Sequence, residues 1–322
     1  AGARVGTATS GPGLGLKIEG IGHAAAMEVP VVIFDCQRKG PDTGSPTKTE
    51  QADFDLVRAG SHGDIPKIIL APAHQEECFW FAAKALNLAD KYRCPVFVLS
   101  DLILAEGKGP IRIPDLSNIS IDRGALLRAL DIANMTEPFL PYKDTPSGIS
   151  PRIVLGERGA VQRMLGTTHN ETGNITVTAE GIAKASAKLM RKMDTYLRED
   201  FCMPRVSGIL PASDLILVGW GSTEGAIREA AIRLRKEGRS PATVHFTHLW
   251  PLDTKKIRGV FADVDHPDII VIEGNYSGQF ANILEWKLKR DLKRLNFYHG
   301  RAIQPQEICE GIARICRISV EV

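Results

Sequence analysis

Polar residues that could bind an anion gather in one segment, residues 37–53, which reads QRKGPDTGSPTKTEQAD. Four of its side chains can hydrogen-bond to a ligand: Arg38, Thr43, Thr47 and Gln51. Its glycines and prolines restrict the backbone, so we expect a bent rather than a floppy loop. A guanidinium pairs bidentately with a carboxylate or a phosphate, which makes Arg38 the leading candidate. The alternative is that Arg38 pairs with Asp35 or Glu50 and only braces the loop.

A turn of small residues lies earlier in the chain, after a predicted strand over residues 4–9. The turn leads into a predicted small-residue helix that ends near Met27. Backbone N–H groups at the start of a helix can hold an anion, and an ordinary strand–helix turn is the alternative. The candidate binding residues in this turn are Ser10, Gly11, Pro12 and Gly13.

Other motifs for cofactors and metals are weak. Gly219-x-Gly221-x-x-x-Gly225 departs from the G-x-G-x-x-G dinucleotide pattern. None of the eight histidines has metal-ligand spacing, although His62 and His169 stand out because they lie in polar loops. The six cysteines form no Cys-x-x-Cys pair, so no metal site is predicted on this chain.

Strand-like and helix-like segments alternate, which predicts an α/β fold with parallel sheets covered by helices. Predicted strands cover residues 4–9, 29–36, 67–70, 95–99, 215–218, 243–247 and 269–273, and predicted helices cover 75–92 and 180–198. In open parallel sheets, ligands bind beyond the carboxyl ends of the strands. That rule selects the loops after Thr9, Cys36, Val218 and Glu273.

The pattern divides the chain into three parts. Residues 1–105 form a first α/β domain, 106–205 a long connecting region, and 206–322 a second α/β domain. A connection this long is uncommon without a purpose, so we expect it to pack on a domain or a partner.

The composition is that of an ordinary globular protein, with 43% hydrophobic and 24% charged residues. A net charge of +2 does not suggest a nucleic-acid or membrane partner. The densest basic run, residues 287–294, is predicted to be the solvated face of a helix. Low cysteine density favours the cytoplasm.

Several of these segments together resemble one family. TATSGPGLGL, EVPVVIFDCQRKGPDTGSPTKTEQADF and LAPAHQEECFWFAAKALNLADKYRCPVFVLSD are similar to the α subunit of 2-oxoacid:ferredoxin oxidoreductases, most of all the 2-oxoglutarate type. GISPR, THNETGNIT, GWGSTEGA, HLWPL and EGNYSGQ extend the resemblance over nearly the whole chain.

The resemblance implies oxidative decarboxylation of a 2-oxoacid with thiamine diphosphate, transfer of the acyl group to coenzyme A, and electron flow to ferredoxin. It implies a pyrimidine-binding domain followed by a transketolase-C-terminal-like domain. It also places the substrate carboxylate against Arg38. Mg²⁺, the iron–sulfur cluster and part of the cofactor site would belong to a β subunit, so the active enzyme would be a heteromer.

Three features depart from the family. Lys39 and Asp42 stand where glycine and serine are usual, and they could pair with each other or alter substrate choice; His23 replaces an apolar residue. The family's Y-P-I-T-P-type segment and activating glutamate lie upstream of Ala1, so we expect this chain to be incomplete at its N-terminus. Pyruvate or branched-chain 2-oxoacid specificity, and a non-catalytic assembly module, remain alternatives.

Overall fold

A computed structural model of the chain describes residues 2–208, 210–262 and 268–318. Its first sheet has the strand order β1-β2-β4-β3-β10. β1 (Gly6–Thr9), β2 (Val31–Gln37), β4 (Pro95–Asp101) and β3 (Ile68–Leu70) run parallel, and β10 (His248–Trp250) pairs antiparallel with β3. The associated helices are α1 (Pro12–Gly15), α2 (Ile18–Ala26), α3 (Phe54–Ala59), α4 (Gln75–Tyr92) and α5 (Leu102–Glu106).

The second sheet has the order β12-β11-β8-β9-β7. β12 (Lys293–Asn296), β11 (Asp268–Glu273), β8 (Leu215–Trp220) and β9 (Pro241–Phe246) are parallel, and β7 (Arg205–Ser207) is antiparallel at the edge. Its helices are α8 (Glu224–Lys236), α9 (Thr254–Val260), α10 (Gln279–Leu288) and α11 (Pro305–Ile318), with the short 3₁₀ turns η2 (Leu210–Ala212) and η3 (Gly221–Thr223).

One hydrophobic core joins the two sheets. Phe54 of α3 packs edge-on against Phe280 of α10, with ring centroids 5.8 Å apart, and its ring lies 6.2 Å from that of Trp220 in β8. All three side chains are fully buried. Because burying aromatic surface contributes strongly to stability, this contact fixes the sheets relative to each other.

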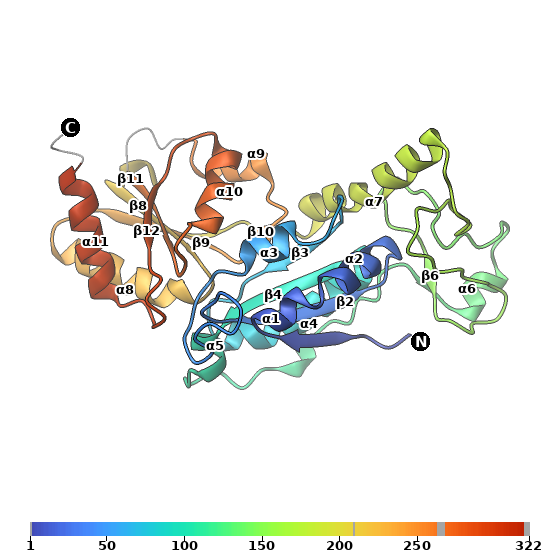
Figure 1. Cartoon of the computed structure of the whole chain (residues 1–322), viewed down its shortest axis with the longest axis horizontal. Helices are drawn as coiled ribbons and strands as arrows, with labels where there is room; N and C mark the ends of the chain where they lie inside the picture. The colour runs from blue at the N-terminus through green and yellow to red at the C-terminus, as the bar shows by residue number, and fades with distance from the viewer. Residues whose placement is uncertain (1, 209, 263–267, 319–322) are drawn as a thin grey trace.

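The region between the sheets extends away from the first sheet and then returns to it (Figure 1). It contains η1 (Leu116–Asn118), β5 (Leu126–Leu127), α6 (Ala129–Ala133), β6 (Arg152–Ile153) and the long helix α7 (Ala179–Glu199). Asp90 of α4 anchors it through ion pairs with Arg123 and Arg152, both 2.7 Å long. The connection therefore packs against the first sheet's helices.

The structure confirms the α/β fold class and most predicted elements. The helix predicted over residues 75–92 has the same bounds as α4, while the helix predicted to run to Met27 divides into α1 and α2. The helical prediction for residues 287–294 holds only as far as Leu288, where α10 ends, and is wrong beyond it, because Lys289 takes a left-handed backbone conformation and β12 begins at Lys293. The division at residues 105 and 205 remains a prediction, since β10 lies late in the sequence but belongs to the first sheet.

Among the described residues, no helix is both long and apolar enough to cross a bilayer.

Candidate active site

The two anion-binding candidates meet at the carboxyl ends of β1 and β2. A Cβ atom on Gly11 would lie 2.7 Å from Arg38 Nε, and Gly11 has a φ of +56°. Only glycine fits a left-handed position in such close contact. Ser10 Oγ donates a hydrogen bond of 2.7 Å to the Cys36 carbonyl, which ties the turn to the end of β2. The turn and the arginine therefore form one surface.

The loop over residues 37–53 is braced by Lys39 rather than by Arg38. Lys39 Nζ pairs with Glu50 Oε1 at 2.7 Å, and the Gly40 amide donates to Glu50 Oε2 at 3.0 Å. The Lys39 amide also donates to the Lys48 carbonyl at 2.8 Å. These contacts confirm the expected bent loop. The suggested pairing of Lys39 with Asp42 is therefore wrong, because Lys39 pairs with Glu50 instead.

Arg38 keeps most of its hydrogen-bonding capacity. Its Nη1 donates to the Thr43 carbonyl at 3.0 Å, which fixes the direction of the side chain. Within the described part of the chain, no carboxylate oxygen lies within 4.0 Å of its guanidinium, so the predicted alternative of a bracing pair with Asp35 or Glu50 is wrong. A partly exposed guanidinium with unused donors can accept an anionic ligand.

The other predicted site residues offer fewer free hydrogen-bond donors than Arg38. Thr43 and Thr47 are exposed on the loop, and Thr43 Oγ1 donates to Asp42 at 3.1 Å. In the turn, the Gly13 amide already donates to the Ser10 carbonyl at 3.3 Å. Pro12 has no amide hydrogen. The turn therefore presents few free backbone donors to an anion, and its main feature is the close contact with Arg38.

Sequence reasoning missed a pair of aspartates, Asp35 and Asp53, whose carboxyls meet where the loop begins and ends. Asp35, on β2, is fully buried, and neither of its carboxyl oxygens has a conventional donor among the described residues. Burial and the neighbouring Asp53 carboxyl together raise the pKa of Asp35 far above its usual range. Burial also raises the pKa of Asp53. The two carboxyls therefore hold a proton between them at neutral pH.

Gln51 connects the loop to the second sheet instead of facing a ligand. Its side-chain Nε2 donates to the Trp220 carbonyl at 3.0 Å, and its Oε1 accepts from the Gly274 amide at 2.9 Å. Gly221, with a φ of +57°, approaches this amide so closely that a Cβ would lie 2.9 Å from Nε2. Gly221 of the Gly219-x-Gly221 motif thus serves this junction, and Gln51 is removed from the ligand-binding candidates.

These contacts bring together all four loops that the strand-end rule selected. The turn after β1 contacts the loop after β2 through Gly11 and Arg38, and Gln51 joins that loop to those after β8 and β11. A cavity of about 150 Å³ lies behind the loop, between Glu50, Asp101 and Ser222. No set of three His, Cys, Asp or Glu side chains in the described ranges is arranged to hold a metal ion. His62 and His169 lie elsewhere, in two adjoining cavities that share Ala26 and Gly166.

Comparison with known proteins identifies the family. The family model described as pyruvate flavodoxin/ferredoxin oxidoreductase, thiamine diphosphate-binding, matches residues 1–188. The α subunit of 2-oxoacid:ferredoxin oxidoreductase 1 from Aeropyrum pernix is 35% identical over 98% of this chain and 49% of its own length. The 2-oxoglutarate synthase subunit KorA from Methanothermobacter thermautotrophicus is 30% identical, over 98% of this chain and 81% of that relative.

A solved structure agrees with these relatives. The 2-oxoglutarate:ferredoxin oxidoreductase from Magnetococcus marinus, with 2-oxoglutarate, coenzyme A and succinyl-CoA bound, superposes with a TM-score of 0.89. It is 30% identical, and the match covers 97% of this chain and 53% of that one. The chain spans about half the length of the first curated relatives that it matches. Matches of this extent in sequence and structure show that the chain belongs to the family of 2-oxoacid:ferredoxin oxidoreductase α subunits.

Proposed function

We propose that this chain is the α subunit of a thiamine-diphosphate-dependent enzyme that oxidatively decarboxylates 2-oxoglutarate. The acyl product would pass to coenzyme A and the electrons to ferredoxin. The observation that carries the proposal is the Arg38 guanidinium, which lies against the turn after β1 and has no carboxylate partner in the described structure. A 2-oxoacid supplies the missing carboxylate.

In this proposal Arg38 neutralises the substrate carboxylate and orients it, which is a positioning role. The Thr43 carbonyl holds the guanidinium in place. The exposed hydroxyls of Thr43 and Thr47 lie on the same loop and are the next candidates for contact with the substrate.

Thiamine diphosphate, when bound, supplies the electron sink that decarboxylation of a 2-oxoacid requires. The turn formed by Ser10, Gly11, Pro12 and Gly13 fits a place beside it, because the bare backbone of Gly11 lets the turn lie directly against Arg38. The sequence has no Gly-Asp-Gly…Asn segment and no cysteine cluster. We therefore assign Mg²⁺ and an iron–sulfur cluster to a β subunit, which would complete the site. Low cysteine content supports the cytoplasm as its compartment.

The choice of 2-oxoglutarate rests on relatives. The Methanothermobacter thermautotrophicus subunit is named for 2-oxoglutarate, and the Magnetococcus marinus structure holds it together with coenzyme A. A substrate panel tests the choice: co-expressed α and β chains reduce ferredoxin or viologen with 2-oxoglutarate, pyruvate or 2-oxoisovalerate. The proposal expects the highest kcat/KM with 2-oxoglutarate. A clear preference for pyruvate or 2-oxoisovalerate would overturn that choice, and no activity with any of the three would leave the assembly-module alternative.

The role of Arg38 is tested separately. Arg38→Lys keeps the charge but removes the bidentate fork, so KM for the 2-oxoacid should rise on the order of tenfold, the value of one charge-assisted hydrogen bond. Arg228→Lys, an exposed position on α8, is the matched control and should leave KM unchanged. Equal KM values for the two variants would show that Arg38 does not hold the carboxylate.

A further inference from the structure

The two aspartates at the ends of the loop over residues 37–53 form a pair that is unusual in its position. Asp35 is fully buried on β2, and its register neighbours, Thr9 on β1 and Leu99 on β4, carry no charge. Asp53 occupies the N-cap position of α3, yet its side chain makes no capping hydrogen bond. An aspartate at that position normally accepts from amides of the first helical turn. The Asp53 carboxyl instead meets that of Asp35.

Gln37 holds this aspartate pair close to Arg38. Its Oε1 accepts from the Asp53 amide at 3.1 Å, and its Nε2 donates to the Ser100 carbonyl at 3.1 Å. Gln37 is 1% exposed and directly precedes Arg38, so one buried side chain fixes the end of the loop against its beginning. The positive charge of Arg38 therefore acts on the Asp53 carboxyl, although no ion pair joins them in the described structure.

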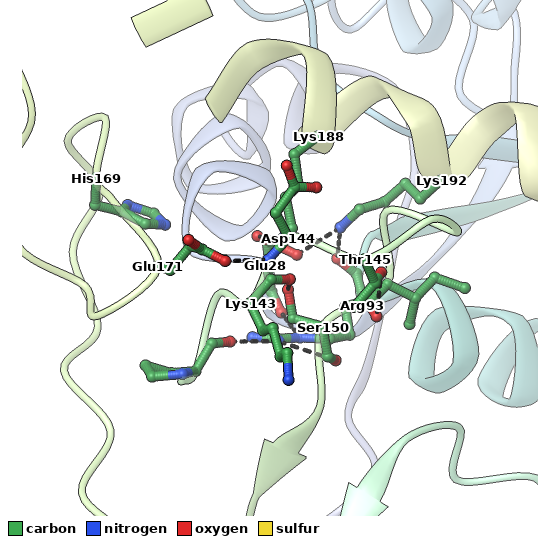
Figure 2. Close-up of polar contacts among 12 residues, drawn as sticks. Glu28, Arg93, Lys143, Asp144, Thr145, Ser150, His169, Glu171, Lys188 and Lys192 are labelled. Carbon is green, nitrogen blue, oxygen red and sulfur yellow. Dashed lines mark hydrogen bonds and ion pairs between the residues drawn. The ribbon is translucent and has the colours of Figure 1, made fainter. Parts of the chain in front are cut away.

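A buried carboxylate before the amino end of β2 shows what the aspartate pair lacks. Glu28 is 3% exposed and pairs with Lys188 and with Lys192, the latter at 2.8 Å (Figure 2). Burial alone would raise the pKa of Glu28, but the neighbouring cations, Lys192 foremost, hold it well below its usual range. Asp35 has no such cation within the described residues. Its negative charge is therefore costly, and a proton takes the place of the missing cation.

Three charged groups determine how this proton is held. Burial, and after it the carboxyl of Asp53, raises the pKa of Asp35 to about 9. Burial also raises the pKa of Asp53; the charge of Glu50 adds to this rise, and that of Arg38 opposes it. The proton of the pair is thus bound more tightly when the positive charge of Arg38 is weakened.

The other titratable groups nearby already have partners of their own. Glu50 pairs with Lys39 at 2.7 Å. Asp101, at the end of β4, accepts hydrogen bonds from Ser222 and from two amides of α5. Burial raises the pKa of the Cys36 thiol, which is therefore neutral at pH 7. These groups do not supply the charge that the aspartate pair lacks.

Arg38 and the aspartate pair consequently share one charge balance. The pair carries one negative charge while it keeps its proton and two once the proton is lost. The second charge attracts the guanidinium and repels any carboxylate that approaches it. By linkage the effect is reciprocal: an anion bound to Arg38 raises the affinity of the pair for its proton by the same factor.

We propose that the proton held by Asp35 and Asp53 controls substrate binding, because it keeps the Arg38 guanidinium available for the carboxylate of the 2-oxoacid. The identity of the ligand rests on the proposed function, whereas the coupling between Arg38 and the pair belongs to this chain itself. Both aspartates are positioning residues, since they act on the substrate through Arg38. Loss of the proton weakens substrate binding.

The KM for 2-oxoglutarate at pH 7 and at pH 9.5, measured by viologen reduction with the co-expressed α and β chains, tests the coupling. The unaltered complex should show a KM on the order of tenfold higher at pH 9.5, the effect of one added like charge. Asp35→Asn has no proton to lose, so its KM should be nearly the same at both pH values. Asp42→Asn is the matched control on the same loop. The Thr43 amide and hydroxyl lower the pKa of the exposed Asp42, so this variant should keep the tenfold difference.

A second measurement needs no substrate. Infrared difference spectra between the unaltered complex and Asp35→Asn contain the C=O band of the protonated carboxyl, and its loss with rising pH gives the midpoint of the pair. The same spectra in an Arg38→Gln background should give a midpoint about one pH unit higher, because the opposing cation is gone. If Asp35→Asn does not fold, Asp53→Asn takes its place. That variant removes the repulsion between the carboxyls, so the band and the rise in KM should move to lower pH together.

Two results would overturn the proposal. One is an equal ratio of KM values between the two pH values in Asp35→Asn and in the unaltered complex. The other is an infrared midpoint that Arg38→Gln leaves unchanged. Absence of turnover with any 2-oxoacid would instead overturn the proposed function, and the infrared titration would still decide whether Arg38 and the aspartate pair are coupled.

Discussion

At the scale of single residues, the site depends on how buried charges are compensated. Arg38 lies at a loop surface with one backbone carbonyl as partner. Asp35 on β2 and Asp53 at the end of the same loop are carboxyls without a cation in pairing distance among the described residues. Spacing in the sequence could select Arg38, because a guanidinium in a bent polar loop indicates anion binding. It could not select the aspartate pair, because Asp35 and Asp53 approach each other only once the loop has folded back.

The aspartate pair makes stability depend on pH. Burial first, and then the charge of Asp53, raises the pKa of Asp35 in the folded state, whereas an unfolded aspartate has a pKa of roughly 4. The folded protein therefore binds more protons than the unfolded chain above pH 4, and its stability falls as pH rises. Asp35→Asn removes this titration. The variant should be more stable than the unaltered protein at pH 8, with a difference that shrinks towards pH 4.

Urea unfolding at pH 5 and pH 8 measures that difference. Asp194→Asn, at an exposed position on α7, is the matched control. It should change the urea midpoint by the same amount at pH 5 and at pH 8. The shared proton would be contradicted if Asp35→Asn and the unaltered protein differed in unfolding free energy by the same amount at both pH values.

At the scale of elements, the sequence predicted the helices and strands whose own residues show a clear hydrophobic pattern. The apolar residues of α4 recur every three or four positions, and β2, β4, β8 and β11 are continuous apolar runs between turns. β10 escaped prediction because its three residues are a strand only through pairing with β3, 178 positions away between His248 and Leu70. Gln51 was misassigned for the same reason, since its partners come from the second sheet.

The Gln51 junction can be tested by truncation. Gln51→Ala leaves the Gly274 amide without its partner and removes one of the two side-chain donors to the Trp220 carbonyl, the other being Thr223, so stability should fall by about 1–3 kcal/mol. Gln306→Ala, an exposed glutamine on α11, is the control and should change stability by less than about 0.5 kcal/mol. Denaturant unfolding measures both. A loss for Gln51→Ala no greater than that of the control would mean that the aromatic contacts alone hold the two sheets together.

At the scale of the whole molecule, the carboxyl ends of the two sheets meet at the proposed substrate site. Arg38 and the Ser10–Gly13 turn come from the first sheet, and the loops after β8 and β11 hold the rear of the Arg38 loop through Gln51. The side chains that would hold Mg²⁺ and diphosphate are not among the motifs of this sequence. The proposed function therefore expects a cofactor site that a second subunit completes.

Thiamine diphosphate binding tests the shared site. If diphosphate and Mg²⁺ are held by a β subunit, this chain alone makes only the contacts on its own side. The lost interactions should weaken cofactor binding by more than tenfold, that is, by more than about 1.4 kcal/mol. Calorimetric titration of the cofactor with Mg²⁺ into the α chain, and then into the co-expressed αβ complex, compares the two. Arg38→Lys in the complex should bind the cofactor like the unaltered complex, because Arg38 is assigned to the substrate. Equally tight binding by the α chain alone would show that this chain holds the whole cofactor site.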